Sequence, residues 1–305
     1  NNHISHCGQA GIVGSMGAAF SEVYGNEIHD IHIGRSFGGA EMAGIKFHAP
    51  IDCLIRDNHI YRCDGRAGMW LDWMTQGTRV TGNLFHDNTQ DIFVEVNHGP
   101  FVIDNNIMLS KTVLLEACGG GAYVNNLFAG KFRLRKETSR KTPYHPPHST
   151  KIAGLSKVVG DDERFYNNLF AGGTGLAVYD SWKPENLCAV GNVYLGGAKA
   201  SVKDRGQIVN DDFEPGIELL EKSDGWYLKM KVDPAWDKQK RKFVTTEMLG
   251  KAVVSGLEYL QPDGEPYRII TDYFGDERNA GDPFAGPFEV GGVKNVKLKV
   301  WPKNE

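Results

Sequence analysis

One short phrase recurs through the first two thirds of the chain: an Asn followed by an apolar or aromatic pair. Clear copies begin at Asn58, Asn83, Asn106, Asn126, Asn168 and Asn192, and a weaker copy begins at Asn2. Successive clear copies are 25, 23, 20, 42 and 24 residues apart. A period in the low twenties, with short β-branched runs and Gly-rich turns, is typical of a solenoid of stacked strands. The chain is therefore predicted to be all-β, a right-handed parallel β-helix.

The repeated Asn is expected at a sharp bend, where its side chain tolerates unusual backbone angles and bonds to neighbouring backbone. We therefore assign the Asn column to the scaffold and not to a functional site. A leucine-rich repeat is the main competing fold. It would need a Leu-x-x-Leu-x-Leu phrase in every unit, and the chain lacks that phrase.

Two regions are predicted from the extent of the repeat. Residues 1–205 form the coils that carry the candidate site, with a loop inserted at 131–160 that accounts for the 42-residue step. The basic, proline-containing part of this loop, 131–152, is expected to leave the solenoid. Residues 206–305 form a hairpin, turning at 223–225, and a cap packed on the helix. The chain opens without Met or a signal peptide, so the N-terminal coils are expected to be absent.

Composition excludes several classes of protein. A formal net charge of -4 provides no basic field for nucleic acid or an anionic membrane. No apolar run approaches the roughly 18 residues of a membrane span. Five scattered cysteines indicate reduced thiols and favour a cytoplasmic over a secreted protein. His145 and His148 could suggest a metal, but a solvated Pro/His loop is the favoured interpretation, so no metal is predicted.

Two acidic residues occupy the same position in successive coils. Asp72 lies 11 residues before Asn83, and Glu95 lies 11 residues before Asn106. Since alternate residues of a strand face opposite sides, both carboxylates are expected on the outer face of one parallel sheet. Their separation should follow the strand spacing, about 5 Å.

That spacing favours one kind of chemistry. Retaining glycosidases place two carboxyl groups ~5–5.5 Å apart, whereas inverting enzymes need ~6.5–9.5 Å to admit a water. One carboxylate attacks the anomeric carbon, and the other donates a proton and later activates water. Trp70, Trp73 and Phe93 lie beside the two acids in sequence, and sugar rings stack on exposed aromatic faces. Trp73 is also a candidate core residue.

Residues 68–109, which contain the phrases WLDW and VEVNHGP, resemble the catalytic core of glycoside hydrolase family 120, the β-xylosidases with a β-helix fold. The phrases TTEMLGKAVVSG and ITDYFG also resemble this family. By this resemblance, Asp72 is the nucleophile and Glu95 the general acid/base. The implied activity is exo-acting release of xylose from the non-reducing end of β-1,4-xylo-oligosaccharides, with no cofactor.

Family members are about twice as long as this chain, which resembles their C-terminal half. The other half is expected in a separate or missing segment that carries the earlier coils and a β-sandwich. The expected partner is the xylo-oligosaccharide, with no nucleic acid and no membrane. A homo-oligomer stays open, with residues 131–152 as a candidate subunit contact.

Neighbours of the two acids are candidate substrate-binding residues. They were chosen for their coil, their strand parity or their closeness in sequence, and they are His6, Glu41, Trp70, Asp91, His98 and Glu116. A structural role is at least as frequent for a lone polar residue of this kind, which often caps or solvates a turn.

Two other classes of function stay open. A β-helix polysaccharide lyase would need an Arg or Lys base, and no such residue of matching parity is expected beside Asp72 and Glu95, with Arg79 placed in a turn. A non-enzymatic carbohydrate-binding solenoid would not be expected to crowd two acids with aromatic rings. Activity on a nitrophenyl β-xyloside, measured with and without chelator, distinguishes a glycoside hydrolase from a lyase and from a binding protein without activity.

Overall fold

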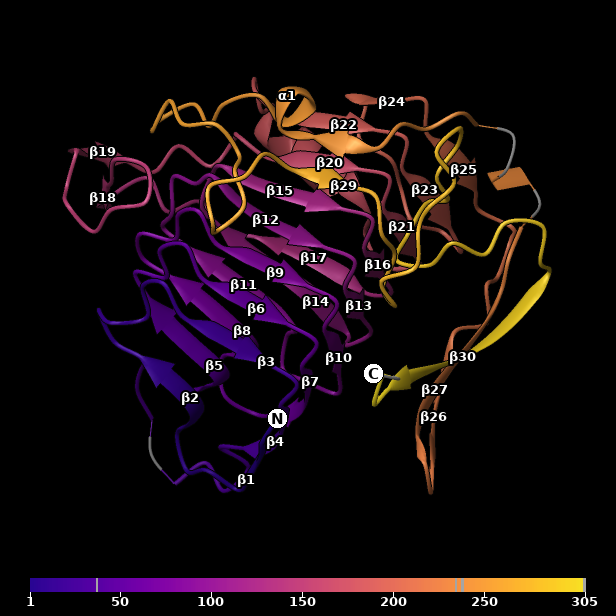
Figure 1. The fold of residues 1–305 in the computed structure, drawn as a ribbon, viewed down its shortest axis with the longest axis horizontal. Helices are drawn as coiled ribbons and strands as arrows, with labels where there is room; N and C mark the ends of the chain where they lie inside the picture. Colours follow the sequence, from indigo (N-terminus) through magenta and orange to yellow (C-terminus); the bar gives the residue numbers. More distant parts are fainter. Residues whose placement is uncertain (37, 234, 237–238, 304–305) are drawn as a thin grey trace.

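The computed structural model describes residues 1–36, 38–233, 235–236 and 239–303. Short strands form most of its regular structure, and 23 of them pair in parallel in three sheets that run side by side along one axis (Figure 1). The predicted parallel β-helix is therefore confirmed. No helix in the described part of the chain is long and apolar enough to span a membrane.

Sheet A has nine strands, which follow the Asn bends. From the N-terminal end they are β1 (His3–Ser5), β4 (Glu27–Ile31), β7 (His59–Cys63), β10 (Leu84–His86), β13 (Ile107–Met108), β16 (Leu127–Phe128), β21 (Leu169–Ala171), β23 (Val193–Leu195) and β25 (Ile208–Asn210).

Sheet B has six strands and carries the two candidate carboxylates. They are β2 (Ala10–Gly14), β5 (Ala43–His48), β8 (Ala67–Asp72), β11 (Ile92–Glu95), β14 (Thr112–Ala117) and β17 (Lys131–Leu134). In the coil after β21, the 3-10 helix η1 (Leu176–Trp182) follows where the earlier coils place a strand of sheet B.

Sheet C has eight strands, which precede the Asn bends. They are β3 (Glu22–Tyr24), β6 (Leu54–Arg56), β9 (Arg79–Thr81), β12 (Phe101–Asp104), β15 (Gly121–Val124), β20 (Arg164–Tyr166), β22 (Cys188–Val190) and β24 (Asp204–Arg205). One coil therefore runs from sheet C through the Asn bend to sheet A and then to sheet B.

The Asn residues form a continuous ladder inside the bends. In each step, the side-chain oxygen of one Asn accepts hydrogen bonds from the backbone N–H and the side-chain Nδ2 of the Asn in the preceding coil. For Asn83 and Asn106, both bonds are 2.9 Å long. The ladder begins at Asn2, includes Asn26, which lacks the apolar pair of the repeated phrase, and ends where Asn192 donates to Asp204. The predicted scaffold role is confirmed.

The interior of the solenoid is a stack of apolar side chains. Inward residues of sheet B repeat at matching register, as Ile45, Met69, Ile92 and Leu114 do, and all four are buried. Aromatic rings stack farther along, with Phe128 over Phe170 at 5.2 Å. Burial of each such side chain contributes about 1.5–3 kcal/mol to folding.

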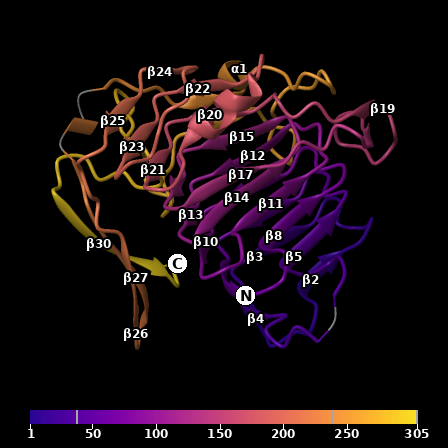
Figure 2. The ribbon, with the colours of Figure 1, turned by 180° about the vertical axis from the view of Figure 1, so that it is seen from behind.

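The inserted segment differs from its prediction. Lys131–Leu134 does not leave the solenoid but pairs with β14 as the last strand of sheet B. Beyond it, β18 (Lys141–Tyr144) and β19 (Gly154–Lys157) form a hairpin that projects from the side opposite β26, β27 and β30 (Figure 2). Gln76 holds the hairpin to the solenoid. Its side-chain oxygen accepts a hydrogen bond from the His145 backbone N–H at 3.1 Å, and its Nε2 donates to the His145 carbonyl at 3.1 Å.

The C-terminal region covers two of the three sheets. The predicted hairpin forms as β26 (Glu218–Lys222) and β27 (Gly225–Lys231), joined by β30 (Asn295–Trp301). Its apolar side chains pack on outward residues of sheet A, such as Leu84 and Ile107. The segments β28 (Val244–Thr245), α1 (Thr246–Leu249) and β29 (Arg268–Ile269) pack on sheet C.

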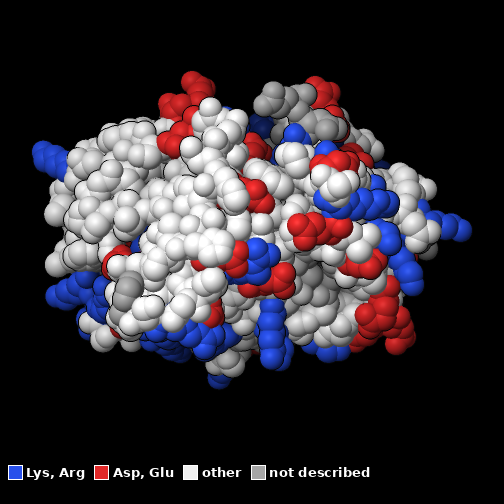
Figure 3. Space-filling model, turned by 90° about the horizontal axis from the view of Figure 1, so that it is seen from below, with Lys and Arg blue, Asp and Glu red and all other residues white. Residues whose placement is uncertain are grey.

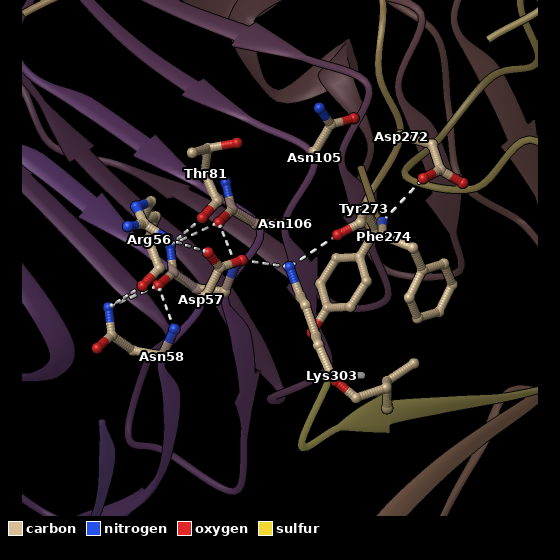
Figure 4. A network of polar contacts seen from close by, with 12 residues as sticks. Arg56, Asp57, Asn58, Thr81, Asn105, Asn106, Asp272, Tyr273, Phe274 and Lys303 are labelled. Carbon is tan, nitrogen blue, oxygen red and sulfur yellow. Dashed lines mark hydrogen bonds and ion pairs between the residues drawn. The ribbon is translucent and has the colours of Figure 1, made fainter. Parts of the chain in front are cut away.

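The C-terminal end is fastened to sheet C by a polar network (Figure 4). The ammonium group of Lys303 donates to Asp57 Oδ1 at 2.5 Å and to the Tyr273 carbonyl at 2.7 Å. Arg56 reaches the other carboxylate oxygen of Asp57 at 3.0 Å. The C-terminal region thus packs on sheets A and C. The inserted segment instead adds β17 to sheet B, and its hairpin is bonded to Gln76.

Candidate active site

Asp72 and Glu95 are direct neighbours on the outer face of sheet B. β8 and β11 pair in parallel with Asp72 opposite Glu95 and Trp70 opposite Phe93. Leu71 and Val94, between them in sequence, are buried in the solenoid core. The strand spacing of about 4.8 Å therefore separates the two residues. The register predicted from the Asn bends is the one that the structure has.

Asp72 is held by polar side chains from the preceding coil, of which Lys46 is buried and His48 and Glu41 are partly exposed. Its Oδ2 accepts from Lys46 Nζ at 2.6 Å and lies 2.9 Å from His48 Nε2. Glu41 lies on the far side of both, 3.4 Å from Lys46 and 3.6 Å from His48. The Lys46 side chain is fully buried, so its ammonium group stabilises the negative charge of Asp72 with little screening by water. Oδ1 of Asp72 is buried and has no hydrogen-bond partner among the described residues.

The expectation that no Lys or Arg of matching parity lies beside the pair was wrong. Lys46 is opposite Trp70 in the sheet and His48 is opposite Asp72, so both face outward with the carboxylates. Their spacing of two residues in β5 was the signal that could have found them.

Glu95 is held by the inserted segment instead. Arg135 donates a hydrogen bond to Glu95 Oε1, and Arg140 Nη1 lies 3.7 Å from the same oxygen. Burial and the negative charge of Asp72 raise the pKa of the Glu95 carboxyl, while Arg135 and Arg140 oppose that rise. No sequence signal linked these two arginines to Glu95, since they come from outside the repeat.

Apolar rings line the sheet beside the pair. Trp70 stacks on Phe93 with 5.0 Å between ring centroids, and Leu115 continues the row in the next coil. Lys46 Nζ lies 3.8 Å from the centre of the Trp70 ring. Trp73 is only partly buried and lies outside the core clusters, in a bend with positive φ, so the core role suggested for it was wrong.

The other predicted binding residues divide into two groups. The structure brings Glu41 to the pair through Lys46 and His48. It does not bring Glu116 there, because Glu116 pairs with Val94 and points into the core, where Tyr123 donates to it at 3.1 Å. The outward neighbour of Glu95 in that coil is Ala117.

His6, Asp91 and His98 are also engaged elsewhere. The exposed His6 ring lies 6.2 Å from His29 of sheet A. Asp91 is fully buried and accepts hydrogen bonds from the backbone N–H and hydroxyl of Ser110. Burial raises its pKa to about 7.

His98 is a buried anchor for the hairpin. Its Nε2 lies 3.0 Å from the Thr142 carbonyl and 3.2 Å from the Ser156 carbonyl, one on each hairpin strand. Burial lowers its pKa. It therefore fixes the inserted segment beside Glu95 without facing the pair.

Two surface cavities lie away from this site. Cavities of about 660 Å³ and 430 Å³ lie against the C-terminal region, and neither is lined by Asp72 or Glu95. We identify the site by its chemistry, two outward carboxylates in register with cations on either side. Among the described residues, no three His, Cys, Asp or Glu side chains are grouped so as to hold a metal ion.

Comparison with known proteins agrees with this fold. Residues 1–130 match the family described as the right handed beta helix region. Together with the three parallel sheets, this match defines the chain as a right-handed parallel β-helix protein.

A solved structure is similar over nearly the whole chain. It is the complex of XylC with xylose, with 37% sequence identity and a TM-score of 0.91, covering 99% of this chain and 51% of that chain. The match confirms the resemblance to glycoside hydrolase family 120, and this chain spans about half the length of XylC. No curated protein matches the chain.

Proposed function

We propose that the chain carries the catalytic pair of a retaining glycoside hydrolase that releases xylose from the non-reducing end of β-1,4-xylo-oligosaccharides. The observation that carries the proposal is the register of Asp72 and Glu95 on neighbouring strands. A strand spacing of about 4.8 Å suits direct attack by a carboxylate and is short for an intervening water. The xylose bound to XylC, the similar protein, supports the choice of sugar.

Asp72 is proposed as the nucleophile. Lys46 and His48 hold one carboxylate oxygen, and Oδ1 has no hydrogen-bond partner among the described residues, so its lone pairs are not engaged by the protein there. Lys46 fixes the position of the Asp72 carboxylate, and a carboxylate is a nucleophile that can form a covalent glycosyl-enzyme.

Glu95 is proposed as the general acid and then the general base. Burial and the charge of Asp72 favour its protonated form, which donates to the leaving oxygen. Once the glycosyl-enzyme ester has formed, Asp72 no longer carries a charge. Glu95 then loses a reason to stay protonated and can take a proton from water.

The test is turnover of a nitrophenyl β-xyloside followed by NMR of the first sugar released. We expect β-xylose to appear before mutarotation, and Asp72→Ala to abolish turnover while the circular dichroism spectrum stays unchanged. Initial release of α-xylose would contradict retention, and an active Asp72→Ala variant would contradict the role of Asp72.

A β-helix polysaccharide lyase is the second candidate, because Lys46 and Arg135 place basic groups beside the two carboxylates. A lyase would leave the nitrophenyl β-xyloside intact and cleave a uronide by elimination, giving a product with a conjugated double bond. Ultraviolet absorbance of that product, measured with and without chelator, separates it from hydrolysis.

A further inference from the structure

The inserted segment concentrates positive charge beside an open sheet. Residues 131–160 contain eight Lys and Arg and one acidic residue, Glu137, in a chain whose net charge is -4. Figure 3 shows Lys and Arg side chains gathered along the lower left edge of the end view, while both signs alternate elsewhere on that face. A local excess of this kind attracts anions.

Two guanidinium groups of the segment converge on one carboxylate. Arg135 follows β17 directly, its backbone N–H donates to the Glu116 carbonyl at 2.8 Å, and its guanidinium lies 5.2 Å from the Phe93 ring centre. Arg135 and Arg140 both approach Glu95 Oε1. Each of the two side chains is 44% exposed, so a ligand can reach both while they remain near Glu95.

Their position along the solenoid identifies the part of a substrate they would meet. The outward column runs from His48 to Asp72 to Glu95, and Arg135 comes from the second coil beyond Glu95, away from Asp72. A general acid donates to the leaving oxygen, so the leaving group occupies the space beside Glu95 on the side away from the nucleophile. The arginines lie on that side.

We propose that Arg135 and Arg140 form a subsite for a carboxylate on the leaving group, so that oligosaccharides with a uronic acid next to the scissile bond are preferred substrates. The inference rests on the proposed function and names its substrate class. A guanidinium binds a carboxylate through two parallel hydrogen bonds, which a neutral hydroxyl cannot match.

Binding of a substrate carboxylate by Arg135, in place of Glu95, would also favour the protonated form of Glu95 that catalysis needs. In the free protein, Arg135 opposes the rise in the pKa of Glu95. A substrate carboxylate that takes over Arg135 removes this opposition, and burial and the charge of Asp72 then favour the protonated acid. An acidic substrate would thus favour the protonated form of Glu95, which donates the proton that cleavage requires.

The experiment compares binding of two non-hydrolysable probes, 4-carboxyphenyl 1-thio-β-xyloside and its methyl ester, by isothermal titration calorimetry. We expect the carboxylate to bind about tenfold more tightly than the ester at low salt. The preference should disappear in Arg135→Gln and weaken in Arg140→Gln. Lys136→Gln, whose ammonium lies 5.2 Å from the Trp182 ring centre, is the matched control and should keep the preference.

The outcomes separate the two proposals. Equal binding of both probes to the wild type, or a preference that survives Arg135→Gln, overturns the carboxylate subsite and leaves the proposed function standing. Failure of both probes to bind, by a protein whose circular dichroism shows it folded, counts against a β-xyloside site and overturns both.

Discussion

Asp72 and Glu95 have equivalent backbone positions, but the cations beside their carboxylates differ in exposure to solvent. Lys46, which faces Asp72, belongs to a central strand and is fully buried. Arg135, which faces Glu95, belongs to the inserted segment and is nearly half exposed. An ion pair that is buried away from water is little screened, whereas an exposed cation is screened and can be displaced by another ligand. The two surroundings differ in the way that the proposed roles require, a fixed carboxylate at Asp72 and a proton-exchanging one at Glu95.

Replacing the proton donor gives the first prediction. Glu95→Ala should lower kcat on xylobiose about 10²–10⁴-fold, with a much smaller loss on a nitrophenyl xyloside, whose leaving group needs no proton. Added azide should restore turnover and give a β-configured xylosyl azide by NMR, because azide attacks the glycosyl-enzyme without a general base. An α-configured azide, or an equal loss on both substrates, would count against the assignment.

Removing the buried cation gives the second prediction. Lys46→Met should lower the free energy of unfolding in urea by about 3–5 kcal/mol, because Asp72 and Glu41 then lack their shared counter-charge. The double variant Lys46→Met/Asp72→Leu should recover part of this loss.

The control is Lys199→Met, which breaks an exposed pair with Asp211 and should cost less than about 1 kcal/mol. A Lys46→Met variant as stable as the control would show that the pair contributes nothing to folding.

Among the elements, the Asn ladder sets the register on which the site depends. Asn106 accepts from both nitrogens offered by Asn83 and donates to Asn126 and to the carbonyls of Val80 and Asp104. Every one of these groups is buried away from water, so losing the amide leaves several of them unpaired. The hydrogen bonds of the bends therefore contribute to stability together with those of the strands they join.

Asn106→Ala should accordingly lower the free energy of unfolding by about 2–4 kcal/mol, measured by urea denaturation. Asn186→Ala, at an exposed position with only 3.4 Å contacts to Asp161, should change it by less than about 0.5 kcal/mol. Similar losses in both variants would mean that the ladder is not the source of the stability.

The same bends explain which parts of the site could be predicted from sequence. Counting 11 residues back from Asn83 and Asn106 found Asp72 and Glu95 because the turns between sheets B and C have equal length in these two coils. His48, their neighbour in the column, is 10 residues before Asn58, and Ala117 is 9 residues before Asn126. A count that ignores variable turns therefore missed His48 and moved Glu116 to the wrong face.

The contacts of the inserted segment with Glu95 could not be predicted from the repeat, for a different reason. The repeat predicted the fold because every coil packs on its neighbours in the same way and uses the same residue types to do so. Arg135 and Arg140 belong to no repeat, and only the folded path of the segment brings them to Glu95.

For the molecule as a whole, a buried pair of acids links stability to pH. Glu116 and Glu163 lie together inside the solenoid, and both are fully buried. Tyr123 and Tyr179 donate hydrogen bonds to Glu116. Burial raises the pKa of Glu116 to about 8 and the pKa of Glu163 well above its ordinary range. The folded protein therefore holds protons that the unfolded chain, with carboxyl pKa values near 4.3, has already lost at neutral pH.

The free energy of unfolding should thus fall as pH rises from about 4.5 to about 8, because over this range the folded state binds more protons. Glu163→Gln, which cannot ionise, should flatten this dependence in urea titrations at pH 5, 6, 7 and 8. Glu258→Gln, an exposed substitution, should leave the slope as it is. A slope that is the same in all three proteins would exclude the interior pair as its cause.

The path of the inserted segment also has a consequence for how a solenoid of this kind can vary. Asn126 bonds directly to Asn168 although 42 residues separate them, so the segment leaves and re-enters the solenoid at stacked positions. Its length and composition can change without shifting the strands that space Asp72 and Glu95. If the two proposals above hold, bond cleavage and the choice of leaving group depend on separable stretches of chain. Grafting the segment from one relative onto another should transfer a preference for the leaving group and keep the catalytic spacing intact.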